Sequence, residues 1–117
     1  MNPLSGSNNS ARADMTPPDV NYSDDARDDL DAIFLYIVEM SGFSRTAQNY
    51  IERIMARCEL IGTAPDSGIA RPDFGPGIRQ TPFERLVIVY DAQRDNVLIL
   101  RIFSSAQDYE TIMRDRP

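Results

Sequence analysis

Residues 64–103 read APDSGIARPDFGPGIRQTPFERLVIVYDAQRDNVLILRIF, a segment rich in glycine and proline that leads into two apolar runs. Glycine and proline interrupt both helix and strand patterns, so Pro65–Gly77 is predicted to be a surface loop. Leu86–Tyr90 and Val97–Ile102 are short and rich in β-branched residues, and the polar stretch Asp91–Asn96 separates them. This arrangement is typical of a β-hairpin.

Two helices are predicted before this loop. Ser23 is well placed to cap the first, because its hydroxyl can accept a hydrogen bond from a free amide of the first turn. Gly42 is predicted to end that helix, and a second helix is predicted over Ser44–Gly62. Apolar residues recur at helical spacing on one face of each helix: Leu30, Ile33, Phe34, Ile37 and Val38 in the first, and Ala47, Ile51, Ile54, Met55, Cys58 and Ile61 in the second.

The short link between these helices predicts an antiparallel helical hairpin, whose apolar stripes need cover from the later strands. The predicted fold class is therefore α+β, with an N-terminal helical hairpin packed on a sheet. Asp19–Tyr22 is a candidate for a short edge strand. Ala106–Arg114 has weak helical character, and Tyr109, Ile112 and Met113 are available to dock this short C-terminal helix.

A chain of 117 residues is long enough for one domain with a modest core. Residues 1–18 are rich in serine, asparagine and proline and poor in apolar side chains, which favours a disordered leader. Met15 is an alternative start, in which case the residues before it are not native. The domain is predicted to comprise residues 19–117.

The charge of the chain indicates what kind of partner it has. The formal net charge is -6 and the pI is about 4.5, so the surface as a whole does not attract phosphate backbones. A protein partner is expected, and direct contact with nucleic acid is not. The sequence contains no apolar run of membrane-spanning length and no signal-peptide pattern. Cys58 is the single cysteine and cannot form an internal disulfide, so a cytoplasmic location is predicted.

Several kinds of catalytic site are excluded by composition. The chain has no histidine, which rules out a Ser-His-Asp triad, a Cys-His pair and any metal site that uses histidine. Cys58 lies on the apolar stripe of the second helix and is interpreted as a core residue. The acidic segment SDDARDDLD favours a solvated helix start over a cation site, and GPGIR favours a turn over a phosphate loop. We therefore expect no cofactor and no metal.

Three arginines, Arg79, Arg85 and Arg101, lie on or beside the predicted strands. If they share one face of the sheet, they could stabilise phosphate charge in a ribonuclease. Taken singly, each arginine is more simply interpreted as pairing with nearby carboxylates such as Asp73, Glu84 and Asp91. The sequence leaves both interpretations open.

The order of these segments resembles the ParE-type toxins of the ParE/RelE toxin–antitoxin superfamily. The matching segments are YSDDARDDLDAIFLYI, RTAQNYIERIMARCELI, APDSGIARPDFGPGIR, FERLVIVYD and NVLILRIF, which span about Val20 to Asp108. The resemblance implies a helical hairpin packed on a small twisted antiparallel sheet. It also implies the toxin half of a type II pair that a cognate ParD-like antitoxin neutralises in a hetero-oligomer.

The resemblance implies two alternative activities. ParE-like members poison DNA gyrase without a known hydrolytic site, whereas RelE-like members cleave mRNA on the ribosome. The basic block that the family carries after the last strand is replaced here by Ser104-Ser105-Ala106-Gln107-Asp108. Without these basic residues, and with an acidic chain, docking at a site lined by ribosomal RNA is unfavourable. Gyrase inhibition is the first hypothesis, and the alternatives are a RelE-like ribonuclease and a non-toxic relative that acts only in the antitoxin complex.

The resemblance also suggests two sets of contact residues. The candidate target-binding residues are Arg79, Arg85, Arg101, Ser104, Ser105 and Asp108. The candidate antitoxin-binding residues are apolar side chains expected to remain exposed once the core is built, because a wrapping tail needs an apolar surface: Phe34, Ile37, Tyr50, Ile54 and Phe83.

Overall fold

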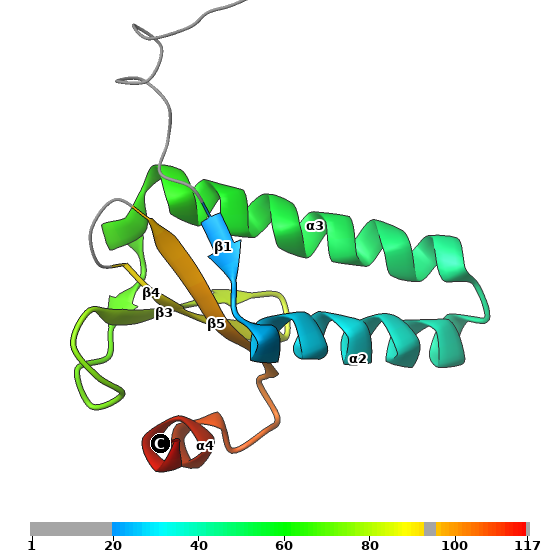
Figure 1. The fold of residues 1–117 in the computed structure, drawn as a ribbon. Coiled ribbons are helices and arrows are strands. Elements are labelled where there is room, and N and C mark those ends of the chain that lie inside the picture. Colours follow the sequence, from blue (N-terminus) through cyan, green and yellow to red (C-terminus); the bar gives the residue numbers. More distant parts are fainter. Residues whose placement is uncertain (1–19, 93–95, 117) are drawn as a thin grey trace, which may run out of the picture.

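The computed structural model describes residues 20–92 and 96–116. Two long helices, α2 (Asp24–Ser41) and α3 (Ser44–Thr63), form an antiparallel hairpin that packs across one face of a β-sheet (Figure 1). The hairpin extends well past the edge of the sheet, so its distal part has no strand beneath it (Figure 1). The predicted leader, residues 1–18, lies outside the described residues.

The sheet has five strands in the order β1-β5-β4-β3-β2. Its centre is the predicted hairpin of β4 (Leu86–Asp91) and β5 (Val97–Ser104), which pair antiparallel. The edge strand β1 (Val20–Tyr22) pairs parallel with β5, so the sheet is mixed. These strands and the helical hairpin confirm the predicted α+β class.

The predicted start and end of α2 are both confirmed. Ser23 Oγ accepts a hydrogen bond from the amide of Ala26 at 3.0 Å and donates one to the carbonyl oxygen of Leu100 at 2.7 Å. Gly42 adopts a φ of 80°, the left-handed conformation that ends helices and favours glycine. Ser23 therefore both caps α2 and attaches it to β5.

The sequence pattern does not predict β3 (Ile78–Phe83) or the two-residue β2 (Ile69–Ala70). Proline removes a ladder donor, so Pro82 argues against a strand. In the structure β2 pairs only with Arg79 and Gln80 of β3. The edge of β3 at Pro82 therefore has no pairing with β2, and the missing amide hydrogen of proline is not needed there. The predicted loop therefore contains two short ordered pieces, η1 (Pro65–Ser67) and β2.

Each face of the sheet carries its own hydrophobic cluster. The first cluster lies between the sheet and the helical hairpin, and its buried members include Ile54, Cys58, Ile61, Ile88, Tyr90 and Ile99. The second lies on the opposite face and comprises Phe74, Ile78, Val87, Val89, Phe103 and Met113. Met113 belongs to α4 (Tyr109–Asp115), the predicted C-terminal helix, which covers this second face.

The predicted core stripe of α3 is confirmed except at Met55. Ala47, Ile54, Cys58 and Ile61 are buried, whereas Met55 is 41% exposed. Met55 follows Ile54 directly, and successive residues of a helix point about 100° apart. With Ile54 directed at the sheet, Met55 is turned toward the solvent.

Candidate functional site

Arg101 is held in a structural contact between β5 and α2. Its Nε and Nη2 donate to the two carboxylate oxygens of Asp29, at 2.8 and 3.0 Å. Asp29 Oδ2 also accepts the amide hydrogen of Ile102 at 2.8 Å. Hydrogen bonding to Asp29 raises the pKa of the Arg101 guanidinium, so it stays charged. This arginine attaches the first turns of α2 to the sheet.

Arg79 is also engaged, at the opposite side of the sheet. Its Nη1 donates to the carbonyl oxygen of Gly68 at 2.7 Å and to that of Asp66 at 3.2 Å. The same loop is held by Tyr90, whose hydroxyl accepts from the Gly68 amide at 3.0 Å and donates to the Pro65 carbonyl at 2.8 Å. A Cβ at Gly68 would lie 2.4 Å from that hydroxyl, so the contact requires glycine.

The three candidate arginines do not share one face of the sheet, which was one of the two arrangements that the sequence left open. Arg79 pairs across the strands with Tyr90, whose side chain belongs to the first cluster. Arg101 pairs with Val89, whose side chain belongs to the second cluster. Directly paired residues project to the same face, and neighbours along a strand project to opposite faces. The register therefore separates Arg79 from Arg101.

Arg85 differs from the other two arginines because it is exposed and free. It lies in the two-residue turn between β3 and β4, where Glu84 adopts a φ of 56°. Among residues 20–92 and 96–116, nothing forms an ion pair or hydrogen bond with its guanidinium. The Ser105 amide donates to the Arg85 carbonyl oxygen at 2.8 Å, and Ser104 pairs with Leu86. Arg85, Ser104 and Ser105 therefore lie together at one end of the sheet.

Asp108 has a capping role. Its carboxylate accepts from the amide of Thr111 at 3.4 Å and from the hydroxyl of Thr111 at 2.8 Å. These bonds satisfy free groups at the start of α4. Of the six candidate target-binding residues, three are thus brought together at the sheet end, and the other three are used in structural contacts.

Two of the apolar candidates border this sheet end. Tyr50 and Phe83 are half-buried and flank the guanidinium of Arg53, with distances of 5.3 and 5.8 Å to the ring centres. Arg53 also forms an ion pair with Glu84, the residue before Arg85. We call Tyr50, Phe83, Arg85, Ser104 and Ser105 the sheet-end surface.

The remaining apolar candidates are less accessible than expected. Ile54 is completely buried against the sheet, so its assignment to an exposed surface is wrong. Phe34 and Ile37 are half-buried. The apolar side chains that are exposed on and after α2 are different ones: Leu35, Tyr36, Met40 and Phe43. Helical periodicity could have separated Leu35 and Tyr36 from the core stripe, but the lack of a strand beneath this part of α2 appears only in the fold (Figure 1).

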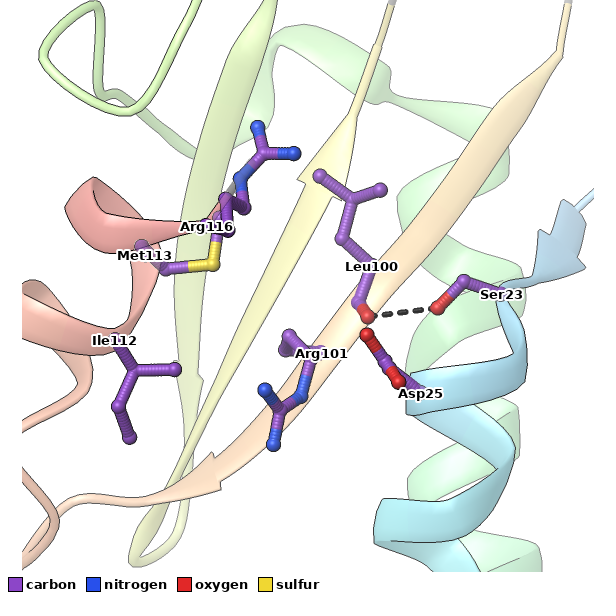
Figure 2. Close-up of a pocket in the computed structure, with 7 residues that line it drawn as sticks. All are labelled: Ser23, Asp25, Leu100, Arg101, Ile112, Met113 and Arg116. Atoms are coloured by element: carbon purple, nitrogen blue, oxygen red, sulfur yellow. Dashed lines mark hydrogen bonds between the residues drawn. The ribbon is translucent and has the colours of Figure 1, made fainter.

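A shallow pocket of about 110 Å³ opens beside the start of α2 (Figure 2). Figure 2 shows α2 on one side of it, β5 as its floor and α4 on the other side. Its lining combines acidic, basic and apolar side chains: Asp25, Leu100, Arg101, Ile112, Met113 and Arg116.

An ionic cluster that the sequence did not predict joins the loop after β2 to α4. Arg71 donates to both oxygens of Asp73 at 3.0 and 2.9 Å, to Glu110 at 3.0 Å and to Gln80 at 2.7 Å. Arg114 of α4 donates to Asp73 at 2.9 Å. Hydrogen bonds from Arg71 and Arg114 hold the pKa of the Asp73 carboxyl well below its usual range. Every charge in this cluster has a partner, so it serves the fold.

Cys58 is a core residue, as predicted. Burial raises the pKa of its thiol to about 11, and burial likewise raises the pKa of the neighbouring Tyr22. A protonated, buried thiol is a poor nucleophile. Within residues 20–92 and 96–116, no three acidic or cysteine side chains are grouped to hold a metal ion. The same residues include no helix that is long and apolar enough to cross a membrane.

Comparison with known proteins identifies the family. The model of the ParE toxin of type II toxin–antitoxin systems, parDE, matches residues 20–109. The chain therefore belongs to the ParE toxin family. A solved structure of the chromosomal ParDE toxin–antitoxin system from P. aeruginosa has a TM-score of 0.64 and 24% sequence identity, with coverage of 74% of this chain and 95% of that one. No curated protein matches the sequence.

Proposed function

We propose that this protein is the toxin of a type II toxin–antitoxin pair, and that it inhibits DNA gyrase by binding and without hydrolysis. The observation that carries the proposal is the family match, which extends from β1 through the last strand to the first residue of α4. The match covers both helices and all five strands, so it describes one structural unit. Residues 19–117 are accordingly proposed to form a single domain.

The distribution of the arginines favours gyrase inhibition over mRNA cleavage. A ribonuclease of this kind would need several cationic side chains directed at one phosphate. Arg79 and Arg101 are bound to backbone and carboxylate groups on opposite faces, and Arg85 alone is free at the sheet end. The net charge of -6 further disfavours docking against ribosomal RNA.

The sheet-end surface is the proposed contact with gyrase. Arg85 supplies a free cation there, and Ser104 and Ser105 supply hydroxyl groups beside it. Tyr50 and Phe83 are predicted from the sequence to bind the antitoxin. Because they border Arg85, we propose them for the gyrase contact instead, where they add apolar area around the Arg53 and Glu84 pair. A central cation with aromatic neighbours is a common composition for the residues that dominate protein interfaces.

The proposed partner is a ParD-like antitoxin encoded beside the toxin, in a cytoplasmic hetero-oligomer. The exposed apolar side chains of the hairpin support a protein partner, because adjoining apolar residues on a surface mark interaction sites. The structural neighbour from P. aeruginosa is itself part of a ParDE system.

The proposal is tested by adding the purified protein to a DNA supercoiling reaction with purified gyrase. We expect inhibition by the wild-type chain, and a loss of inhibition of about tenfold in Arg85→Ala, which corresponds to about 1.4 kcal/mol of binding free energy. Arg45→Ala is the matched control, because Arg45 is an exposed arginine in the first turn of α3, at the end of the hairpin that extends past the sheet (Figure 1). Induction in cells without the antitoxin should also trigger a DNA-damage response.

Two other outcomes would replace the proposal. Cuts in mRNA at codon positions that disappear in Arg85→Ala, with gyrase unaffected, would establish the ribonuclease. Harmless induction combined with tight antitoxin binding would establish the non-toxic relative.

A further inference from the structure

The turn between β3 and β4 has a strained backbone at Glu84. Phe83 pairs with Leu86, so Glu84 and Arg85 form a two-residue hairpin turn. Glu84 adopts a φ of 56°, and no other non-glycine residue in the part of the chain that the structure describes has a positive φ. A two-residue turn with a positive φ at its first position favours glycine there. Strain of this kind persists only where the surroundings hold it, and it is concentrated at functional sites.

Arg53 holds the side chain of Glu84 against α3. The two residues form an ion pair that joins the helix to the turn. The Arg53 guanidinium also lies over the rings of Tyr50 and Phe83, with distances of 5.3 and 5.8 Å to their centres. An exposed ion pair by itself contributes little to stability. Here two aromatic rings restrict the guanidinium, so the ion pair forms with a smaller loss of side-chain entropy.

The backbone of the same turn is held from β5. The Ser105 amide donates to the Arg85 carbonyl oxygen at 2.8 Å, and Ser104 pairs with Leu86 beside it. Helix α3 therefore holds the first residue of the turn through its side chain, and the end of β5 holds the second through its backbone. The exposed guanidinium of Arg85 is carried by a turn that is fixed on both sides. A group fixed in this way loses less freedom when it binds a partner.

The ion pair of Arg53 and Glu84 also determines the charge beside Arg85. Glu84 directly precedes Arg85, so a Glu84 carboxylate released from Arg53 would be free to pair with the guanidinium next to it. That pairing would neutralise the cation that we assign to the gyrase contact. Because Arg53 occupies Glu84, the charge of Arg85 remains available to a partner.

We propose that Arg53 and Glu84 are positioning residues for Arg85. Arg53 binds Glu84, which fixes the turn and keeps the Glu84 carboxylate from pairing with Arg85. Both residues act through Arg85, without a gyrase contact of their own. This inference rests on the proposed inhibition of gyrase and assigns the residues that prepare its contact. It also accounts for a glutamate at a turn position that favours glycine.

The first test compares stability with inhibition in Glu84→Gly. Glycine adopts a positive φ without strain, so the melting temperature should stay the same or rise. Inhibition of purified gyrase in the supercoiling reaction should nevertheless weaken about threefold, because Arg53 no longer holds the turn. A residue with only a structural role would change both measurements in the same direction.

The second test is a double-mutant cycle in the same supercoiling reaction. Arg53→Met should weaken inhibition about tenfold, because it releases Glu84 toward Arg85. Arg53→Met combined with Glu84→Gln should lose only about threefold, because the competing carboxylate is removed as well. Arg45→Met and Glu39→Gln are matched controls at exposed positions near the end of the hairpin that extends past the sheet (Figure 1). Each control should change inhibition by less than about twofold.

The third test measures the turn itself and needs no gyrase. The NMR order parameter of the Arg85 backbone amide should be about 0.85 in the wild-type chain and lower in Glu84→Gln. The amide of Ile88, in the middle of β4, is the internal control and should keep its order parameter in both proteins.

Three outcomes would overturn the inference while the proposed function stands. One is a further loss of threefold or more when Arg53→Met is introduced into Arg85→Ala, since Arg53 would then contact gyrase directly. Another is a double variant, Arg53→Met with Glu84→Gln, that inhibits less well than Arg53→Met alone. The last is an Arg85 order parameter that Glu84→Gln leaves unchanged. If the wild-type chain does not inhibit gyrase, the proposed function fails, and this inference fails with it.

Discussion

The two faces of the sheet are covered in different ways. The first face lies under two helices of 18 and 20 residues, and its cluster is built mainly from aliphatic side chains (Figure 1). The second face lies under a loop and the seven-residue α4, and the ion pairs of Arg71, Asp73, Glu110 and Arg114 surround its smaller cluster. A helix of two turns is not stable alone. Long elements can thus be held by buried area, whereas short ones need directed polar contacts.

The largest expected effect is at the first face. Ile54→Ala should lower the free energy of unfolding by about 2–5 kcal/mol, because it leaves a cavity under a long helix that cannot collapse freely. Urea denaturation measures this loss. Met55→Ala, its exposed neighbour, should cost under about 1 kcal/mol. Similar losses in the two variants would mean that the hairpin is not anchored through this side chain.

The second prediction concerns the ionic cluster. Arg71→Ala should lower the free energy of unfolding by about 1–3 kcal/mol, because it removes hydrogen bonds to two carboxylates and leaves the side-chain oxygen of Gln80 without its donor. Hydrogen exchange should accelerate in α4 and remain slow in the middle of α3. Uniform acceleration across both helices would show that the two faces do not open separately.

The third prediction is a loss of stability at alkaline pH that originates at the first face. The pKa of the Cys58 thiol is raised to about 11, above an ordinary value of about 8.5. The stabilisation that the protonated thiol gives the folded state is therefore complete below about pH 8.5. It is lost as the pH rises toward 11, because the thiol loses its proton at a lower pH in the unfolded chain than in the folded one. Unfolding free energies should fall by about 1–2 kcal/mol between pH 8 and pH 10. Cys58→Ala should flatten this slope, and an unchanged slope would assign it to other groups.

The smallest effect is expected at acid pH and at the second face. The pKa of Asp73 is depressed in the folded state. The stabilisation that its carboxylate gives the folded state is therefore complete above about pH 4 and is lost as the pH falls below that value. Asp73 is partly exposed, and solvent screening keeps the effect small. The NMR signal of the buried Met113 methyl group should broaden below pH 4 before signals from Ile54 change. In Asp73→Asn this signal should be insensitive to pH; a retained acid transition would exclude Asp73 as its origin.

The difference between the two faces also explains how far the sequence could be interpreted. The first face was predictable because helical spacing at Ile54, Cys58 and Ile61 and the β-branched runs of β4 and β5 report burial directly. On the second face the short helix that carries Met113 was predictable from the sequence. The ionic cluster around it was not, because Arg71 pairs with Glu110, 39 residues further along the chain. Long-range ion pairs leave no periodic pattern.

The candidate binding surfaces also combine features that the sequence predicts with features that only the fold decides. The sequence singled out Arg79, Arg85 and Arg101 with equal weight, and only the register separates a free arginine at the sheet end from two bonded ones on opposite faces. Ile54 and Tyr36 are both apolar residues of amphipathic helices. Ile54 is buried because it lies on the stripe of α3 that packs on the first cluster, whereas Tyr36 lies off the apolar stripe of α2 and is exposed.

The sequence by itself determined the elements of this protein: the cap at Ser23, the break at Gly42, the central hairpin and the α+β class. These follow from interactions between residues that are close in the chain, which composition and spacing record. The tertiary structure decided which side chains are available for binding. Whether a side chain is covered depends on what a distant segment places over it, and that is fixed only when the chain has folded.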